Sequence, residues 1–281
     1  MCSSDLMTTA DFTKRKAAGE KIAMLTCYDA MTAKLMAESG IEAVLVGDSL
    51  GMTVLGYADT LSVTMDDMVR HTRAVKRGAP SLFVVADMPF MSYQVSVEEA
   101  VRNAGRLIAE GGAQAVKLEG GAAYADVVRA IVRAGIPVMG HVGLTPQSVN
   151  ALGGYRVQAK TEDAAQVFLE DARSLETAGV FSMVFECVPR EVAQWAAERL
   201  TVPVIGIGAG VGDALAGQIL VWQDMSGLNE GFSPKFVRRF SAAGAEMKKG
   251  FADYVAAVRA GSFPADNESF AASDDVLAKL Y

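Results

Sequence analysis

Short apolar runs recur along this chain, and five of them end in an ionisable residue. A continuous run of about four to eight apolar residues is typical of a strand that is buried on both faces of a parallel sheet. Ionisable residues that follow such strands lie at the carboxyl edge of the sheet, where parallel α/β folds build their sites. The pattern therefore predicts one convergent site. The runs span residues 43–48, 82–87, 115–119, 137–141 and 181–186, and they end at Asp48, Asp87, Glu119, His141 and Glu186.

Three further apolar runs, at residues 23–28, 203–207 and 218–222, bring the predicted strands to eight. Segments with a helical period lie between the runs, at 30–39, 65–77, 122–134, 162–178 and 190–200, and Ser96 with Glu99 forms a capping box that opens another helix. Strands that alternate with helices imply right-handed parallel crossovers. The chain is therefore expected to form an α/β fold, a (β/α)₈ TIM barrel, and a doubly wound open sheet is the alternative.

No linker-like or low-complexity stretch divides the chain, so a single domain is expected over residues 1–281. The barrel would occupy about residues 22–232, and a C-terminal helical tail and arm about residues 233–281. The last twenty residues would be a packed extension or an interface arm. Two connections, 49–61 and 143–160, are long and rich in glycine, which is typical of functional lids.

Composition excludes several classes of protein. The 281 residues are 51% hydrophobic with a mean hydropathy of +0.23, which is ample for a large core and far from a disordered composition. The net charge is −7 and basic residues form no stripe, so nucleic acid and anionic membranes are poor partners. The three cysteines, Cys2, Cys27 and Cys187, are too few and too scattered for a disulfide framework, and no run resembles a signal peptide or a membrane span. A cytoplasmic protein is expected.

The two aspartates of the pattern predict a metal site. Asp48 and Asp87 end strands that neighbour each other in a barrel, and two close carboxylates repel each other without a cation. Mg²⁺ typically binds in this way, coordinated by carboxylate oxygens, water and substrate. Glu119 could add a third oxygen, directly or through water. The alternative is that each aspartate caps the helix that follows its strand.

Two cationic side chains accompany the carboxylates. Lys117 lies two residues before Glu119, so the period of a strand points both to the same side. Inside the barrel, Lys117 would bind an anionic substrate, and the alternative is a lysine that reaches out between helices. His141 has small neighbours that leave room for a ligand, whereas His71 lies in the middle of a predicted helix and is expected in solvent.

Glu186 is the candidate general base. Three apolar neighbours would keep its carboxylate partly out of water, and the alternative is a salt-bridged glutamate on the barrel rim. The glycine-rich turn at 206–210 resembles a phosphate-binding turn, or it allows close backbone packing or a large cosubstrate. A metal, a binding cation and a base together suit proton abstraction next to a carbonyl, because Mg²⁺ chelated by a 2-oxo acid stabilises the enolate.

Seven ordered segments resemble the ketopantoate hydroxymethyltransferase (3-methyl-2-oxobutanoate hydroxymethyltransferase) family. They are TCYDA at 26–30, VGDSLGM at 46–52, ADMPF at 86–90, VKLEG at 116–120, HVGLTPQS at 141–148, GGYRVQ at 153–158 and IGAG at 207–210. The resemblance extends from about Thr13 to Phe263. It implies a TIM barrel, Mg²⁺, 5,10-methylenetetrahydrofolate as one-carbon donor, formation of 2-dehydropantoate (ketopantoate) in pantothenate and coenzyme A biosynthesis, and a large homo-oligomer, a decamer.

The resemblance also assigns roles to single residues. It implies that Glu186 is the catalytic base and that Asp48 and Asp87 hold the metal, with Glu119 near the ion. It also implies that the substrate is bound by five residues, namely Asp48, Ser49, Asp87, Lys117 and His141. Only Ser49 is absent from the strand-end pattern. The sequence departs from the family near the end of the barrel, where Ala216 and Gln223 replace an aspartate and a histidine.

Two alternative functions remain at this stage. A Mg²⁺-dependent lyase or mutase of the phosphoenolpyruvate mutase and isocitrate lyase type would also act on a 2-oxo acid through an enolate. It would be favoured by a catalytic cysteine on a mobile loop, whereas Cys27 and Cys187 lie at strand ends. A non-catalytic barrel would have lost Asp48, Asp87 or Glu186, and all three are present.

Overall fold

Residues 6–231 and 233–280 are described by a computed structural model, and the chain divides into two compact units. The first unit comprises Met1–Trp222 with Pro234–Val237, and the second comprises Gln223–Ser233 with Arg238–Tyr281. All of the candidate site residues lie in the first unit. Within the described residues, no helix is both long and apolar enough to cross a membrane.

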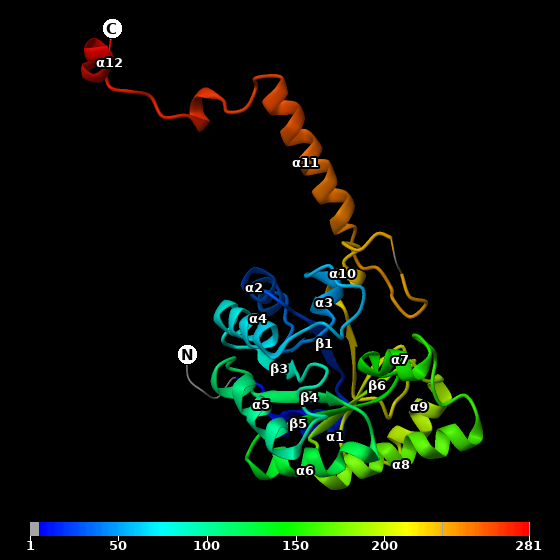
Figure 1. Ribbon diagram of the computed structural model, residues 1–281. Coiled ribbons are helices and arrows are strands. Elements are labelled where there is room, and N and C mark those ends of the chain that lie inside the picture. Colours follow the sequence, from blue (N-terminus) through cyan, green and yellow to red (C-terminus); the bar gives the residue numbers. More distant parts are fainter. Residues whose placement is uncertain (1–5, 232, 281) are drawn as a thin grey trace. The chain divides into compact units, whose positions relative to one another are not determined.

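The first unit is a closed barrel of eight parallel strands in sequence order, with β8 paired to β1 (Figure 1). The predicted (β/α)₈ fold is confirmed, and the strand boundaries agree with the apolar runs to within about two residues. The strands are β1 (Ile22–Thr26), β2 (Ala43–Val46), β3 (Phe83–Asp87), β4 (Ala115–Glu119), β5 (Val138–Gly143), β6 (Ser182–Glu186), β7 (Val204–Ile207) and β8 (Gly217–Leu220).

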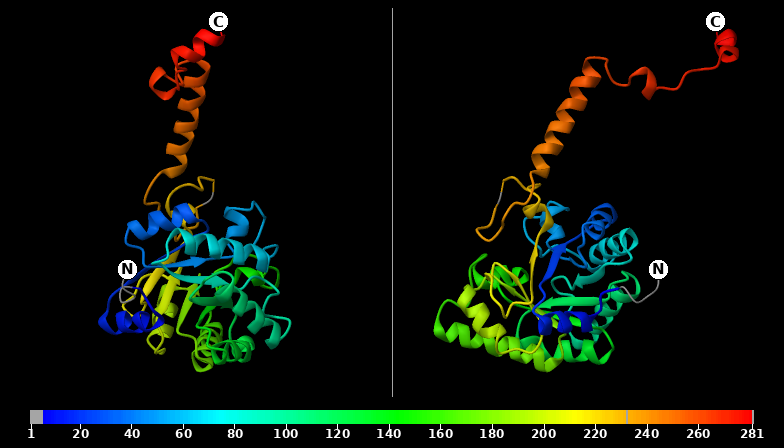
Figure 2. Two further views of the ribbon diagram at one scale, coloured as in Figure 1. Left: turned by 90° about the vertical axis from the view of Figure 1, so that its left-hand side faces the viewer. Right: turned by 180° about the vertical axis from the view of Figure 1, so that it is seen from behind.

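Helices connect most of the strands and surround the barrel (Figure 2). The connection between β7 and β8 departs from the expected strand–helix repeat, because residues 208–216 join these strands without a helix. The helical segments of the first unit are α1 (Thr9–Ala18), α2 (Ala30–Glu38), α3 (Leu50–Thr53), α4 (Met65–Gly78), α5 (Val97–Ala109), η1 (Ala122–Tyr124), α6 (Ala125–Arg133), η2 (Pro146–Ser148), α7 (Val149–Leu152), α8 (Glu162–Ala178) and α9 (Arg190–Ala197).

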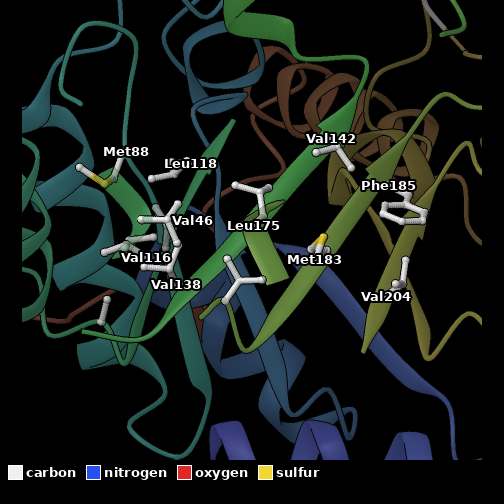
Figure 3. Packing of buried hydrophobic residues seen from close by; sticks show 14 of the residues in the cluster. Val46, Met88, Val116, Leu118, Val138, Val142, Leu175, Met183, Phe185 and Val204 are labelled. Atoms are coloured by element: carbon white, nitrogen blue, oxygen red, sulfur yellow. The ribbon is translucent and has the colours of Figure 1, made fainter. Parts of the chain in front are cut away.

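The side chains of each strand alternate between the barrel interior and the layer beneath the helices. In β4, Val116 and Leu118 join the outer cluster, which contains Leu175 from α8 and Phe185 from β6 (Figure 3). Ala115 belongs instead to the inner cluster, with Phe83 and Val85 of β3 and Met139 of β5. Because the alternation has a period of two, the inward set of these strands continues to Asp87, Lys117, Glu119 and His141 at their carboxyl ends.

An aromatic plug fills the amino end of the barrel. Phe12 of α1 is fully buried, and its ring centroid lies 5.4 Å from that of Phe83 and 5.3 Å from that of Phe181. The start of α1 is fixed by Asp11, whose carboxylate accepts hydrogen bonds from the amide and the hydroxyl of Thr8. The interior is therefore packed at one end, and its polar residues gather at the other.

His71 of α4 differs from the sequence expectation. The residue is half-buried rather than solvated, and its Nδ1 lies 2.6 Å from the carbonyl oxygen of Tyr28. This contact ties α4 to the segment that follows β1. A helical period alone could not show it, because the partner is a backbone atom 43 residues away.

The second unit contains α10 (Trp222–Met225, shared with the end of the first unit), α11 (Ala243–Arg259), η3 (Asp266–Glu268) and α12 (Asp274–Leu280). The predicted helical tail begins later than expected, at Ala243 instead of residue 233. The preceding residues bind another loop of the same unit: the Phe240 amide donates to the Met225 carbonyl, and the Ser241 hydroxyl donates to the Ser226 carbonyl. These contacts occupy the backbone in place of helical hydrogen bonds.

Candidate active site

Five neighbouring strands, β2 to β6, bring the predicted site residues together. The register pairs Asp87 with Lys117, and Glu119 with His141, while Gly143 pairs with Glu186. Asp48 follows β2, and its backbone amide donates a 3.0 Å hydrogen bond to Oδ2 of Asp87. All of the ionisable residues that end the five apolar runs thus lie at one end of the barrel. Each has its place because its strand exits there.

Lys117 lies at the centre of this group. Its Nζ atom is 2.6 Å from Oδ1 of Asp87, 3.7 Å from Oε1 of Glu119 and 3.1 Å from Nδ1 of His141. The side chain is only 3% exposed, so the alternative of a lysine between the helices is wrong. Burial by itself would lower the pKa of Lys117, but the carboxylates of Asp87, Glu119 and Asp48 outweigh it and raise the pKa. Lys117 is a fixed buried cation.

His141 bridges two carboxylates. Its Nδ1 lies 3.4 Å from Oε1 of Glu119, and its Nε2 lies 3.3 Å from Oε2 of Glu186. Burial and the Lys117 ammonium group disfavour a protonated ring, yet the two glutamates prevail and raise the pKa of His141 to about 9. Nδ1 also faces the Lys117 ammonium group, and Nε2 faces Glu186, so the ring lies between the buried cation and this carboxylate.

Neither aspartate caps a helix, so the structural alternative for this pair is wrong. Asp87 accepts hydrogen bonds from the Asp48 amide and lies against Lys117, and Oδ2 of Asp48 accepts a 2.8 Å hydrogen bond from Nε2 of Gln147. Burial, followed by the nearby Asp87 and Glu119 carboxylates, raises the pKa of Asp48 well above its usual value. Burial also raises the pKa of Asp87, against the opposing effect of Lys117. Lys117 therefore offsets only part of the negative charge of this pair.

The charges of the group show which kind of ligand fits. Four carboxylates face only two cationic side chains, so the fully ionised group is two positive charges short of balance. In the described part of the chain, no three His, Cys, Asp or Glu side chains are arranged to enclose a metal ion. The two adjacent aspartates would be the protein donors of a metal ion here, a set that fits a hard divalent cation that keeps several water ligands. Glu119 faces Lys117, His141 and the Gln147 amide instead.

Glu186 is the most accessible of the ionisable residues, with 16% of its side chain exposed. Its ion pair is with His141 inside the barrel, not with a basic residue on the rim. The loop after β5 approaches it closely, because the Leu144 amide donates a 2.8 Å hydrogen bond to the Glu186 carbonyl. Gly143 permits this approach: its φ is +99°, and a Cβ atom there would lie 2.3 Å from the Glu186 carbonyl oxygen.

Ser49 lies beside the aspartates, and its hydroxyl is 2.8 Å from the hydroxyl of Tyr28. The glycine-rich turn at 206–210 packs tightly against its surroundings. A Cβ atom on Gly210 would lie 2.2 Å from Cβ of Arg190, and the Gly210 carbonyl accepts a hydrogen bond from the Gln218 amide group. Close backbone packing, one of the alternatives for this turn, therefore accounts for its glycines.

Two buried polar residues of the site were missed by sequence reasoning. The Gln147 amide contacts Asp48, and the Tyr93 hydroxyl oxygen lies 2.8 Å from Oε1 of Gln147 and 3.0 Å from the Glu119 carbonyl oxygen. Both lie in connections rather than at the ends of strands, where no periodicity marks a buried side chain. Their sequence signal is only that Gln147 falls within the family-like segment at 141–148.

The family model for ketopantoate hydroxymethyltransferase matches residues 6–266. The chain belongs to the ketopantoate hydroxymethyltransferase family. A 3-methyl-2-oxobutanoate hydroxymethyltransferase of Clostridium novyi is 57% identical over 274 residues, which cover 98% of this chain and 99% of the relative. The enzyme of the same name from Enterococcus faecalis is 55% identical over the same shares of both chains.

Solved structures with a similar fold come from other enzymes. A phosphonopyruvate hydrolase matches with a TM-score of 0.63 at 12% identity, over 97% of this chain and 94% of that chain. A 2,3-dimethylmalate lyase, a member of the PEP mutase/isocitrate lyase superfamily, matches with a TM-score of 0.60 at 17% identity, over 98% and 95%. At such low sequence identity these likenesses show the fold alone.

Proposed function

We propose that the chain transfers a hydroxymethyl group from 5,10-methylenetetrahydrofolate to 3-methyl-2-oxobutanoate, giving 2-dehydropantoate in pantothenate biosynthesis in the cytoplasm. In the balanced reaction the C3–H bond of the oxo acid breaks and a C3–CH₂ bond forms. The one-carbon unit leaves the folate nitrogens, and water supplies the hydroxyl oxygen. The observation that carries the proposal is the buried group of Asp48, Asp87, Lys117, His141 and Glu186 in a chain 57% identical to an enzyme of that name.

The donor set supports a Mg²⁺ ion held by Asp48 and Asp87, with Glu119 acting through water because its carboxylate is turned to Lys117 and His141. When bound, the ion supplies positive charge beside the 2-oxo group and so makes the C3 proton more acidic. We assign binding of the substrate carboxylate to Ser49 and Lys117, whose fixed charge favours an anion. His141 lies beside them and partly offsets the negative charge of the neighbouring carboxylates.

Glu186 is proposed to take the proton from C3. Its carboxylate is the only one of the four with an appreciably exposed side chain, so a substrate can reach it. Nε2 of His141 lies 3.3 Å from Oε2 of Glu186, so the imidazole borders this carboxylate on its buried side. The proton then resides on a Glu186 oxygen atom while the one-carbon unit adds to C3.

The two long connections are proposed to cover a reduced folate. The loop after β2 and the loop after β5 meet where the Tyr155 hydroxyl lies 3.9 Å from the Met52 sulfur atom. Burial, followed by the carboxylates of Asp59 and Asp48, raises the pKa of Tyr155, which is consistent with a ring held close to the site. Such apolar, glycine-rich loops offer a large ring system a place between the solvent and the oxo acid.

Exchange of the C3 proton tests this function directly. In D₂O with Mg²⁺, the protein should exchange the C3 proton of 3-methyl-2-oxobutanoate for deuterium, as followed by NMR. Glu186→Gln keeps the shape of the side chain but not its basicity, so substrate should still bind while exchange slows by about 10²- to 10⁴-fold. Excess EDTA should stop exchange in the unaltered protein. Exchange at the full rate in Glu186→Gln would remove the proposed base.

A lyase of the isocitrate lyase type is not favoured. Its expected feature, a reactive cysteine on a mobile loop, is not met by the two cysteines of the described chain, because Cys27 is buried and Cys187 directly follows β6. Cys2 lies outside the described residues. Formation of 2-dehydropantoate from the oxo acid and 5,10-methylenetetrahydrofolate, followed by chromatography, separates the two functions.

A further inference from the structure

The side chain of Gln147 is 4% exposed, and each of its polar atoms has a protein partner. Nε2 lies 2.8 Å from Oδ2 of Asp48 and 2.9 Å from the Met88 carbonyl oxygen. Oε1 accepts a 2.8 Å hydrogen bond from the Tyr93 hydroxyl. A glutamine so completely paired in a loop has one conformation available.

The partners leave no freedom to exchange the two ends of the amide. The Met88 carbonyl can only accept a hydrogen bond, so the NH₂ group must face it, and the second hydrogen of that group then points to Oδ2 of Asp48. Its two hydrogens are thereby committed, one to each partner. Met88 directly follows Asp87, so the NH₂ group connects the Asp48 carboxylate to the backbone beside the second aspartate.

The backbone of Gln147 adds a second connection. Its amide donates a 3.0 Å hydrogen bond to Oε2 of Glu119, and the Tyr93 hydroxyl that fixes the side chain accepts a 3.2 Å hydrogen bond from the Glu119 amide. One residue of the loop after β5 thus contacts the carboxylates of both Asp48 and Glu119. With Oδ2 of Asp48 held by the amide, Oδ1 remains free of Gln147.

We propose that Gln147 is a positioning residue that fixes the Asp48 carboxylate in the orientation needed to bind the divalent ion. The inference rests on the proposed metal function of Asp48 and Asp87. Without the amide, the buried Asp48 carboxylate loses its only side-chain hydrogen-bond donor among the described residues and can rotate. Residues that orient metal ligands in this way typically change metal affinity by about 10- to 100-fold when they are replaced.

The test is direct titration of the metal-free protein with Mn²⁺, with the free ion counted by electron paramagnetic resonance and no substrate present. Gln147→Met keeps the length of the side chain and removes its hydrogen bonds. Gln114→Met is the control, because the Gln114 amide donates to the Leu82 carbonyl and accepts from the Val84 amide at the opposite end of the barrel. Both variants should lose similar stability in thermal unfolding.

The expected result is that Gln147→Met binds Mn²⁺ about 10- to 100-fold more weakly than the unaltered protein, while Gln114→Met binds it normally. If Gln147→Met does not fold, Gln147→Asn, which withdraws the amide from Asp48 by one methylene, should show the same direction. Equal affinity in the Gln147 variants and the unaltered protein would overturn the positioning role. Equal affinity of Asp48→Asn and the unaltered protein would instead overturn the proposed ion site, and the positioning role with it.

Discussion

At the scale of single residues, Cys187 shows how a reactive side chain can lie beside the chemistry without taking part in it. It directly follows Glu186 and has a positive φ of 47°, a conformation that residues other than glycine seldom adopt. Burial, followed by the neighbouring Glu186 carboxylate, raises the pKa of its thiol to about 12. Burial raises the pKa of Cys27 to about 12 as well.

These thiols should react slowly with alkylating reagents. With a pKa of about 12, roughly one thiol in 10⁴ is ionised at pH 8, and only the thiolate is nucleophilic. In a Cys2→Ser protein, iodoacetamide at pH 8 should label Cys27 and Cys187 on the order of 10³-fold more slowly than the same protein in denaturant. Mass spectrometry measures the rates. Rapid labelling of the folded protein with loss of activity would instead support a catalytic cysteine.

The buried cation should contribute strongly to stability as well as to binding. Lys117→Met leaves Asp87 and Glu119 buried without their positive partner, and removal of one member of a buried ion pair costs about 3–5 kcal/mol. Urea unfolding of the metal-free protein at pH 7 measures this loss. The control is Lys14→Met, whose ion pair with Asp11 lies on the surface and should matter little. A similarly small change in both variants would contradict the central role of Lys117.

Sequence reasoning found the ionisable residues because strand periodicity and strand ends are local properties. The inward direction of Lys117 follows from its spacing to Glu119 once the strand is recognised. The pairing of His141 with two glutamates could not be predicted, because it depends on side-chain directions across three strands. Gln147 was missed for a similar reason: its loop has no repeating pattern, and its partners are distant in sequence.

At the scale of elements, α1 precedes the alternating strands and helices, and it fills the amino end of the barrel with Phe12. The sequence did not predict this helix, because only Phe12 among its residues is buried and its other positions are mostly polar. The strands and most of the surrounding helices were predicted, since their apolar periods extend over many residues. The start of α11 was misplaced because hydrogen bonds between residues 225–226 and 240–241 replace the first helical turns.

Phe12 should stabilise the barrel without affecting its chemistry. Phe12→Ala opens a cavity among Phe83, Phe181 and the inner apolar residues, and such a replacement costs about 3–5 kcal/mol. Phe12→Leu fills more of the space and should lose less. Urea unfolding measures the losses of stability. The rate at which the folded variants exchange the C3 proton of 3-methyl-2-oxobutanoate at low temperature should stay unchanged. A change in the exchange rate would show that α1 also shapes the opposite end.

At the scale of the whole molecule, the second unit presents apolar side chains that its own fold does not cover. Met247, Phe251, Tyr254 and Val258 lie on one face of α11, and Phe251 and Tyr254 are 62% and 59% exposed. Their spacing places them at every third or fourth residue, which is typical of a helix face that packs against another surface. This face supports the proposal that the chain forms a homo-oligomer.

The expected assembly is a symmetric homo-oligomer larger than a dimer, and the family resemblance suggests a decamer. Light scattering of the full chain at micromolar concentration measures the mass. Removal of residues 261–281 tests whether the C-terminal arm contributes, since Val276, Leu277 and Leu280 are exposed there as well. A shortened chain with an unchanged number of subunits would assign the contacts to residues outside the arm, α11 among them. A monomeric full chain would contradict the assembly.

The plug formed by Phe12 has a consequence for the order of events in the proposed reaction. Because the described residues fill that end of the barrel, we expect both reactants to enter and both products to leave at the other end. In the proposed function the small oxo acid binds beneath the folate, so we expect it to arrive first and its product to leave last. Initial-rate kinetics should therefore show that the two substrates bind in a compulsory order and form a ternary complex. Double-reciprocal plots should give intersecting lines, and parallel lines would contradict this order. Tetrahydrofolate, the first product to depart, should act as a dead-end ligand when it returns to the enzyme already occupied by the oxo acid.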